Sequence, residues 1–505
     1  MSRIDDLIAR VKAKPSDVAV TVSLAEAAAA CQAEERALPY VAALAAQKRT
    51  DPLLWQWTGL LHRALDGHVE AIKAFNAAGQ LAPGNARIAQ GRAQVALEAG
   101  IDAADLFETA IALEPNNGEM LLSRAAARVA AGDHDRAITE LEGLLAQHPG
   151  WYPGHHRLVQ LRWMMGERDR STDVIERSVA AHPGDLNLWR ILILTHIDAG
   201  QWDAALDAIA RGKAVLGEQL TFTANEATAR SETGDVARAD ELFAVMAKVE
   251  DMSVAIRHVR HLLRNHRIED ALPLIDRALA PGGEGRGMWP YASIAWRLAA
   301  DPRAAWLDEE GSVAVIDLAG HIADIDRLAT VLRGLHRAKN QHLDQSVRGG
   351  TQTDGPLFSR IEPEIQALRS VVSAAVADHV ARFPAREPGH PLLAHGRPPR
   401  ARFAGSWSVR LEGEGHHANH VHPAGWISSA FYVALPPEVD AGGEAGWLTL
   451  GSPQAELGLD IAPVRTIQPK PGRLVLFPST MWHGTRPYAS GERLTVAFDI
   501  ALPVD

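Results

Sequence analysis

The stretch Gly132-Asp-His-Asp-Arg-Ala-Ile-Thr-Glu-Leu-Glu-Gly-Leu-Leu-Ala-Gln-His-Pro149 indicates how the first half of the chain folds. Its apolar residues Ala137, Ile138 and Leu141 recur at the spacing of one helix face. The glycine at its start can end a preceding helix, because glycine adopts positive φ without strain. The proline at its end stops this helix, because proline cannot continue the hydrogen-bond ladder. The stretch therefore predicts one helix of a two-helix unit.

The same two markers recur along the first half of the chain with a common period. The glycines are spaced by 33, 32, 34, 34 and 34 residues, and the prolines by 32, 34 and 34. The markers are Gly67, Gly100, Gly132, Gly166, Gly200 and Gly234, and Pro83, Pro115, Pro149 and Pro183. A period of about 34 residues in two residue types indicates a repeat array, in which each unit buries its apolar stripe against its neighbours.

This pattern resembles tetratricopeptide repeats from about residue 16 to residue 285, with irregular units at both ends. The resemblance implies an all-α superhelix that binds a peptide or partner protein in its groove. A purely structural spacer is the alternative, and the sequence indicates no particular ligand for the groove. Five tryptophans of this region are expected in the repeat core. They are Trp55, Trp57, Trp151, Trp189 and Trp202.

The composition of the 505-residue chain limits the classes of function. Lys and Arg number 51 and Asp and Glu number 62, so the formal net charge is −11. This acidic balance argues against a general nucleic-acid binder, which needs a basic surface. Cys31 is the one cysteine of the sequence. An intramolecular disulfide and a cysteine-based zinc or iron–sulfur site are therefore excluded.

Neither a targeting segment nor a membrane segment is expected. The first residues carry acidic side chains in an amphipathic stretch, and they lack the basic and apolar regions of a signal peptide. The most apolar run, residues 189–194, is too short to cross a bilayer. We therefore expect a cytoplasmic protein with no membrane partner.

After residue 285 the repeat pattern ends, and segments with strand-like and helix-like spacing of apolar residues follow. Residues 312–318 alternate as a strand does, and residues 322–336 and 361–383 are expected to form helices. Residues 344–355 are polar and contain glycines, so we expect a long loop there rather than a helix or a central strand.

From residue 402 the apolar period becomes two, which is typical of a barrel or sandwich. The runs expected to form strands are residues 404–411, 427–435, 447–450, 464–468, 473–477 and 494–500. The chain is therefore expected to be an α + β multidomain protein. The predicted domains are a repeat array over residues 1–285, a connecting segment with supporting helices over residues 286–400, and a β core over residues 401–505.

Histidines are concentrated at the start of this β core. His420 and His422 are two residues apart, and a strand would place both on one face, within reach of one metal ion. His483, just past the run 473–477, is a third candidate ligand. Imidazole suits Fe, Zn, Cu and Ni, so the spacing alone does not select the metal. A structural or surface histidine cluster is the alternative.

The histidines flanking this pair are predicted to have at most a supporting role. His416 has the strand parity of His420, whereas His417 and Asn419 are expected to face the other way. Solvent exposure is the simpler interpretation of these residues. The loop residues Arg348, Gln352 and Thr353 either touch a substrate or only shape the loop.

Arg493, ten residues after His483, begins the last predicted strand, where a guanidinium can hold a carboxylate through two hydrogen bonds. From about residue 400 to residue 503 the sequence resembles the prolyl-hydroxylase-like branch of the 2-oxoglutarate/Fe(II)-dependent oxygenases. The resemblance rests on His420-Val-His422, Ile-Ser-Ser-Ala-Phe-Tyr-Val, Ala-Gly-Gly-Glu, Pro-Gly-Arg-Leu-Val-Leu-Phe-Pro-Ser-Thr-Met-Trp-His483 and Arg493.

The resemblance implies a double-stranded β-helix, or jelly-roll, with Fe(II) as its metal and 2-oxoglutarate as co-substrate. His420 and His483 would hold the iron, and Arg493 would bind the far carboxylate of 2-oxoglutarate. Tyr432 would share that carboxylate, with Ser428 on the same face of its strand. Tyr432 as a core aromatic residue is the alternative.

One position departs from the family pattern, because His422 stands where a carboxylate ligand is usual. Three interpretations follow: a reactive three-histidine iron site, a site of two histidines without His422, or a degenerate domain that does not turn over. Glu412 and Glu414 do not match the ligand position. We favour the first interpretation, because Arg493 and Tyr432 would be unneeded in an inactive site.

The predicted function is hydroxylation of a peptide or protein, with the repeat array as recognition module. The alternative is a repeat-based binding scaffold with a degenerate, non-catalytic oxygenase fold. A weaker option is a three-histidine dioxygenase that needs no 2-oxoglutarate.

Overall fold

The computed structural model describes residues 3–280, 285–308, 310–343 and 345–504. Asp344, within the loop expected over residues 344–355, and the first two residues of the chain lie outside the described part. The described residues form two compact units. One holds the residues up to Glu140 together with Asp354–Arg369, and the other holds Leu141–Thr353 and Ser370–Pro503.

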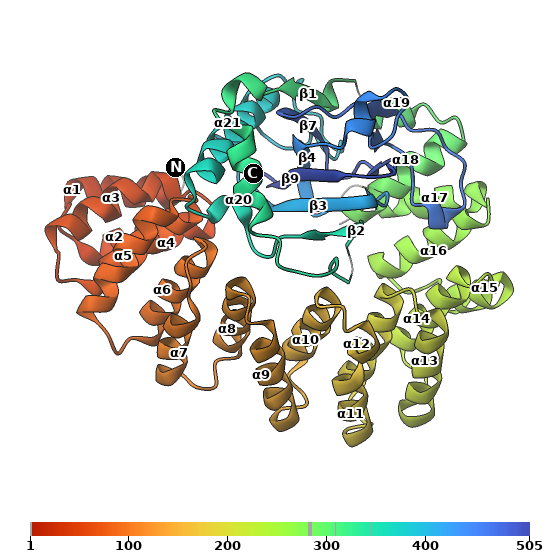
Figure 1. The fold of residues 1–505 in the computed structure, drawn as a ribbon, viewed down its shortest axis with the longest axis horizontal. Helices are drawn as coiled ribbons and strands as arrows, with labels where there is room; N and C mark the ends of the chain where they lie inside the picture. The colour runs from red at the N-terminus through yellow and green to blue at the C-terminus, as the bar shows by residue number, and fades with distance from the viewer. Residues whose placement is uncertain (1–2, 281–284, 309, 344, 505) are drawn as a thin grey trace. The chain divides into compact units, whose positions relative to one another are not determined.

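The described residues up to Leu307 form a succession of helices (Figure 1). In chain order they are α1 (Arg3–Ala13), α2 (Val18–Ala30), α3 (Glu34–Gln47), α4 (Pro52–Ala64), α5 (His68–Leu81), α6 (Ala86–Glu98), α7 (Ala104–Leu113), α8 (Gly118–Ala131), α9 (His134–Gln147), α10 (Tyr152–Met164), α11 (Asp173–Ala181), α12 (Leu186–Asp198), α13 (Trp202–Leu216), α14 (Leu220–Glu232), α15 (Val236–Val245), α16 (Met252–Arg264), α17 (Ile268–Ala278), α18 (Trp289–Leu298) and α19 (Arg303–Leu307).

A residue with positive φ marks the turn inside each helix pair, and it keeps the repeat period even where it is not glycine. Successive positions are spaced by 34, 34, 32, 34, 34, 34, 32 and 34 residues. They are Gln32, Asp66, Gly100, Gly132, Gly166, Gly200, Gly234, His266 and Ala300. The first turn of this series after Gln32 is therefore at Asp66 rather than at Gly67, whose φ is −86°. The turn geometry continues to Ala300, in the stretch where the sequence pattern had faded.

Three of the marker prolines are followed, two residues later, by a residue that caps the next helix. After Pro83, Pro115 and Pro183 that residue is Asn or Asp, and its side chain accepts a hydrogen bond from a backbone N–H of the next helix. Such caps satisfy N–H groups that lack a partner inside the helix. The proline thus ends one helix, and the cap begins the next one two residues later.

Within the first unit, residues 354–369 pack on the turns of two repeats. The backbone N–H of Ile361 donates to the Ala99 carbonyl at 3.3 Å, and Arg369 Nη1 donates to the Asp66 carbonyl at 2.5 Å. The Arg360 guanidinium lies against Gly100, where it leaves no room for a Cβ atom.

Within the second unit, α16, α17 and α18 share a hydrophobic core with loops of the β domain. Leu263 and Trp296 belong to the same buried cluster as Leu457 and Trp482. The indole N–H of Trp482 donates to the Pro290 carbonyl at 2.9 Å. These helices thus help to position the chain next to His483, although they belong to the repeat series.

The β domain contains two antiparallel sheets, one of six strands and one of three. The six-stranded sheet has the order β1-β7-β4-β9-β3-β2, which can be followed from top to bottom in Figure 1, and the three-stranded sheet has the order β6-β5-β8. The strands are β1 (Ala314–Asp317), β2 (Val347–Gln352), β3 (Phe403–His417), β4 (Gly425–Ala434), β5 (Leu448–Leu450), β6 (Arg465–Ile467), β7 (Arg473–Pro478), β8 (His483–Thr485) and β9 (Glu492–Ala501).

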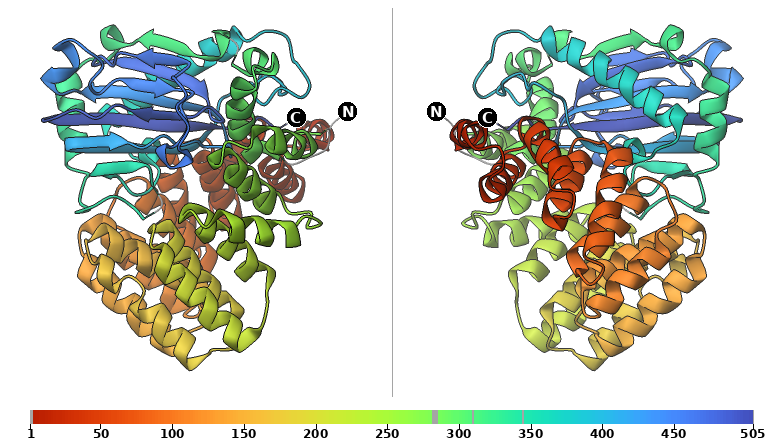
Figure 2. Two further views of the ribbon diagram at one scale, coloured as in Figure 1. Left: turned by 90° about the vertical axis from the view of Figure 1, so that its right-hand side faces the viewer. Right: turned by 90° about the vertical axis from the view of Figure 1, so that its left-hand side faces the viewer.

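Two further helices support the β domain, α20 (Ile325–Arg333) and α21 (Pro363–Ala381). The C-terminal part of α21 crosses one face of the six-stranded sheet, as the right-hand view of Figure 2 shows. This helix lies within the range 361–383 in which a helix is predicted. Its buried residues include Val372, Val376 and Val380.

The structure confirms the predicted fold class, a helical repeat array followed by a jelly-roll with supporting helices. One local expectation was wrong: residues 347–352 of the expected loop form the edge strand β2. Gly349 has φ +68°, and the register with β3 shifts between Arg348 and Gly350. An edge strand can accommodate glycines in a β-bulge. The glycine pair therefore interrupts the hydrogen bonding between β2 and β3 locally, and the two strands still pair on both sides of it. The short strand β8, which contains His483, was not predicted.

No helix of the described residues is long and apolar enough to cross a membrane.

Candidate functional site

The three candidate ligands are brought together by backbone pairing rather than by a regular strand. Strand β3 ends at His417, so His420 and His422 lie beyond it. His420 and His483 form an isolated antiparallel bridge, with N–H···O distances of 2.9 and 3.0 Å. The N–H of His422 donates to the Ser479 carbonyl at 2.9 Å. The expectation of a shared strand face was therefore wrong in its geometry, although the two side chains do converge.

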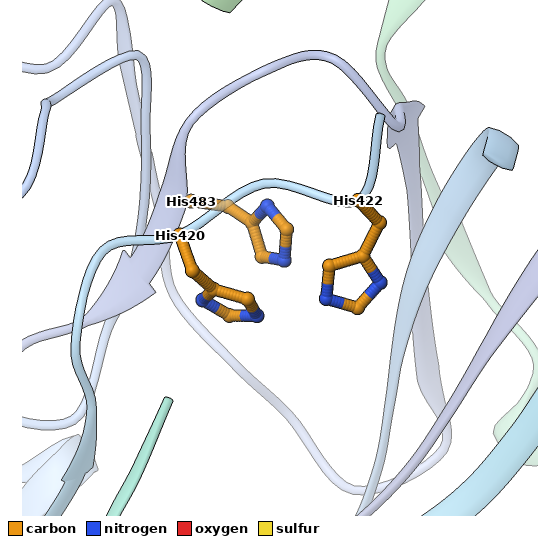
Figure 3. A group of neighbouring side chains, drawn as sticks. All are labelled: His420, His422 and His483. Carbon is orange, nitrogen blue, oxygen red and sulfur yellow. The ribbon is translucent and has the colours of Figure 1, made fainter. Parts of the chain in front are cut away.

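One nitrogen from each of the three imidazoles points into the space between the rings (Figure 3). Each of His420, His422 and His483 offers a nitrogen such that all three lie within 4.8 Å of one another. The ring centroids are 4.1 Å apart for His420 and His483, 4.9 Å for His420 and His422, and 5.2 Å for His422 and His483. This arrangement is a candidate metal site.

The other nitrogen of each ring is held by an acceptor. Nδ1 of His420 lies 2.9 Å from the Ala418 carbonyl, and Nδ1 of His483 lies 3.0 Å from the Met481 carbonyl. Nδ1 of His422 lies 2.6 Å from Oδ2 of Asp499. An acceptor at Nδ1 favours the tautomer with its proton there, which leaves the Nε2 lone pair free to bind a metal.

Burial keeps the imidazoles of His420 and His483 neutral at physiological pH. Burial, reinforced by the neighbouring His422, lowers the pKa of His420 to about 3. Burial and the His420 ring also hold the pKa of His483 well below its usual value. A neutral imidazole is the form that ligates metals, so these ring nitrogens are available to bind a metal cation rather than a proton.

The histidines line a partly open cavity with a volume of about 50 Å³. Its lining is aromatic, apolar and polar but contains no carboxylate, and it is made of Gln345, Ser346, Gln352, Trp407, His417, His420, His422, Ser428, Ser429, Ala430, Leu448, Phe477, His483, Gly484, Thr485, Arg493, Thr495 and Ala497. A lining of apolar and aromatic side chains with a few convergent polar groups is typical of a small-molecule site.

Arg493 lines the same cavity and is 2% exposed. Its Nη1 donates to the Gly446 carbonyl, and its guanidinium lies over the Tyr432 ring, 5.2 Å from the centroid. Arg493 Nε has no hydrogen-bond partner among the described residues. Tyr432 and Tyr488 are buried beside Arg493, but neither tyrosine is among the residues that line the cavity. Burial raises the pKa of Tyr488 to about 12, so this hydroxyl is a donor.

Ser428 lines the same cavity, but its hydroxyl is engaged by a residue that sequence reasoning missed. Ser428 Oγ donates to Asp499 Oδ1 at 2.6 Å and lies 3.0 Å from Ser479 Oγ. Asp499 is opposite Ser428 in the register of β4 and β9. Strand alternation counted from Arg493 through Thr495 and Ala497 would have placed Asp499 on the cavity side of β9.

His417 also lies in the cavity, contrary to the expectation that it faces away. Its ring stacks on that of His420 with centroids 5.9 Å apart, and Ser346 Oγ lies 3.1 Å from His417 Nδ1 and 3.2 Å from His420 Nε2. The prediction assumed that alternate residues of one regular strand face opposite sides. It was wrong because the regular strand β3 ends at His417, before His420. His416 is partly exposed and outside the cavity.

The loop residues differ in their surroundings. Gln352 lines the cavity, whereas the Thr353 hydroxyl accepts the backbone N–H of Ser408 at 3.0 Å. Arg348 donates to the Gln345 carbonyl at 2.6 Å. Asn419 donates to the Pro453 carbonyl at 2.8 Å and so shapes the backbone near His420.

Comparison with family models places this site within a known domain. Residues 405–499 match the model described as "Putative 2OG-Fe(II) oxygenase", and residues 101–161 match one described as "Tetratricopeptide repeat". The chain joins tetratricopeptide repeats to an oxygenase-family domain. The oxygenase match contains the three histidines, Arg493 and Asp499, whereas Gln345, Ser346 and Gln352 of the cavity lining precede it in the chain.

Similar solved structures include proteins of both kinds. A prolyl-4-hydroxylase from Pseudomonas putida is 16% identical, with a TM-score of 0.25 over 38% of this chain and 92% of that chain. YrrB, described as a TPR protein with an unusual peptide-binding site, is 15% identical, with a TM-score of 0.29 over 36% and 94%. A tetratricopeptide repeat protein from Parabacteroides merdae is 14% identical, with a TM-score of 0.29 over 55% and 97%. A search of curated proteins gave no match.

Proposed function

We propose that this protein is an Fe(II)- and 2-oxoglutarate-dependent oxygenase that hydroxylates a peptide or protein. One observation carries the proposal: three imidazoles with converging nitrogens and a buried guanidinium line the same cavity. The first group suits a divalent metal and the second a carboxylate. A site with both can hold a metal ion and an anionic co-substrate side by side.

The donor set of the metal site fits Fe(II). Nδ1 of His420, His422 and His483 is held by an acceptor, so each ring can offer Nε2 to a metal, and Ser346 Oγ lies 3.2 Å from that atom of His420. Imidazole nitrogen is a good ligand for Fe(II), although it also binds zinc, copper and nickel. The described residues contribute no fourth His, Cys, Asp or Glu ligand to this group, which leaves coordination positions for small molecules.

The guanidinium of Arg493 fits a carboxylate of 2-oxoglutarate. Arg493 lines the cavity, and its Nε is a buried polar atom without a partner in the described structure. A buried donor without an acceptor costs roughly 1–3 kcal/mol, and a bound carboxylate would remove that cost. The cation of Arg493 would in addition pair with the carboxylate charge.

Bound iron and 2-oxoglutarate would supply dioxygen activation, with oxidation of the co-substrate to succinate and carbon dioxide as a substrate C–H is hydroxylated. The chain would supply orientation and protection. Arg493 fixes one end of the co-substrate, and the histidine N–H groups fix the three rings. The apolar wall that includes Phe477 and Leu448 keeps bulk water from one side of the cavity.

The proposal is tested by anaerobic titration of the metal-free protein with Fe(II) and then with 2-oxoglutarate. We expect a visible charge-transfer band in the wild type. Arg493→Met should lose the band at co-substrate concentrations that saturate the wild type, because loss of a buried charged partner costs about 2–5 kcal/mol, or roughly 30-fold to several thousandfold in affinity. His422→Ala should weaken Fe(II) binding itself.

Arg465→Met is the matched control, because Arg465 is exposed on β6 and outside the cavity. It should keep the band. Absence of tight Fe(II) binding and of the band in the wild type would overturn the proposal and favour a repeat-based binding scaffold. A band that survives Arg493→Met would contradict the co-substrate assignment and favour a three-histidine dioxygenase.

Tetratricopeptide repeats generally bind proteins or peptides, which supports a peptide or protein as the substrate. This part of the proposal is tested by measuring succinate release with a peptide library and with free amino acids. We expect peptides to stimulate turnover of 2-oxoglutarate and free amino acids to leave it at the basal level. Equal stimulation by free amino acids would contradict a peptide substrate. The cytoplasmic location remains a prediction.

A further inference from the structure

The three candidate ligands differ in the group that holds their Nδ1 atom. For His420 and His483 the acceptor is a neutral backbone carbonyl. For His422 it is the carboxylate of Asp499, at the short distance of 2.6 Å. A carboxylate on the outer nitrogen makes an imidazole a stronger electron donor than a carbonyl does.

The carboxylate at His422 matters because of the charge balance of the site. Three neutral imidazoles would leave both positive charges of a divalent metal uncompensated, and the cavity lining contains no carboxylate. Arg493 adds a further positive charge to the same cavity. In a partly dehydrated site such charges interact strongly, so one nearby anion matters to metal binding.

Asp499 is itself held in place. Ser428 Oγ donates to its Oδ1 at 2.6 Å, and Ser428 is held in turn by Ser479, 3.0 Å away. The carboxylate side chain is 14% exposed and that of His422 is 21% exposed, so solvent screens the pair only in part. Asp499 does not belong to the group whose ligand atoms lie within 4.8 Å, so it is placed to act through His422 rather than on the metal directly.

We propose that Asp499 is a positioning residue that supplies, through His422, the negative charge missing from the three-histidine site. It fixes the tautomer with Nε2 free and raises the donor strength of that nitrogen toward the metal. The inference rests on the proposed function, because it assigns a role to Asp499 in binding the same Fe(II).

The test compares metal binding by the wild type and Asp499→Asn. The amide oxygen can still accept the Nδ1 proton, and its NH₂ group can donate to Ser428, so shape and hydrogen bonds are kept while the charge is removed. Loss of such an outer partner typically weakens metal binding about 10- to 100-fold, and we expect a loss of Fe(II) affinity in this range. The Fe(II)–2-oxoglutarate band should move to shorter wavelength, because the metal becomes a poorer electron donor.

Asp240→Asn is the matched control. Asp240 also accepts from a buried histidine, His261, at 3.2 Å, but in the helical repeats and outside the cavity. The same chemical change there should leave Fe(II) affinity and the band unchanged. Circular dichroism of each metal-free variant checks that the chain is folded.

Ser428→Ala separates an electronic role from a structural one. Removing the hydroxyl that donates to Asp499 leaves its carboxylate a stronger acceptor for His422, so the band should move to longer wavelength, opposite to Asp499→Asn. A merely structural role predicts a shift in the same direction for both variants, or none, and would overturn the inference.

Fe(II) affinity and band position that stay at wild-type values in Asp499→Asn would also overturn it, with the proposed function left standing. A wild type that binds no Fe(II) would overturn the proposed function, and the inference with it.

Discussion

Lowering the pH from 8 to 5 should destabilise the oxygenase domain through His336, a histidine outside the metal site. Its Nδ1 lies 2.8 Å from Thr351 Oγ1 on β2, and its Nε2 lies 3.0 Å from Ser408 Oγ on β3. Burial, reinforced by the Arg410 charge, lowers its pKa from 6.5 to about 4. The neutral ring therefore joins the loop after α20 to the edge of the sheet.

The sign of the effect follows from the two pKa values. Between pH 6.5 and pH 4 the unfolded chain binds a proton at His336 that the folded chain does not, so stability falls as the pH falls. At pH 5 the pH lies about 1.5 units below the pKa of 6.5 in the unfolded chain. This difference corresponds to a loss of at most about 2 kcal/mol in the free energy of unfolding. The loss begins near pH 6.5 and is complete near pH 4.

The assay is urea unfolding of the metal-free wild type and His336→Gln at pH 8, 7, 6 and 5. Glutamine keeps a polar side chain but does not titrate, so the wild type should lose about 2 kcal/mol more than the variant between pH 8 and pH 5. His321→Gln, at an exposed histidine, is the control and should follow the wild type. Equal pH dependence of the wild type and His336→Gln would refute the reasoning.

Two further predictions concern the neighbourhood of His483. Trp482→Phe removes the hydrogen bond to the Pro290 carbonyl and leaves a smaller ring in the core shared with α16–α18, so unfolding in urea should show a loss of about 1–3 kcal/mol. An unchanged midpoint would argue against that shared core. Gly484→Ala would bring a Cβ within 2.0 Å of Asn419 Oδ1, so Fe(II) affinity should fall about tenfold or more with the helical circular dichroism unchanged. Gly320→Ala, with nothing within 4 Å, should bind Fe(II) normally, and equal affinities in both variants would contradict the prediction.

The repeat fold could be predicted from sequence because its information is local. A glycine turn, a proline and an Asn or Asp cap act within a few residues, and the period of 34 repeats them along the chain. The same dependence on local markers explains which turns the glycine pattern missed. Asp66, His266 and Ala300 adopt the turn conformation without being glycine, so a search for glycines alone does not find these turns.

The candidate ligands could also be chosen from sequence, but not the way they are held together. His420, His422, His483 and Arg493 stand out by residue type and spacing. Strand parity, however, misplaced His417, because the regular strand ends before the ligands begin. The bridge between His420 and His483 joins segments more than sixty residues apart, and no local pattern contains it.

By itself the sequence determined the repeat array, the change to a β domain and the residue types that can hold a metal and a carboxylate. These features depend on backbone preferences and on the chemistry of single side chains. Only the tertiary structure decided which nitrogen of each histidine is free, that Asp499 holds His422, and that α16–α18 support the loop before His483. Those contacts join residues distant in the chain, and their geometry is set when the strands pair and the shared core closes.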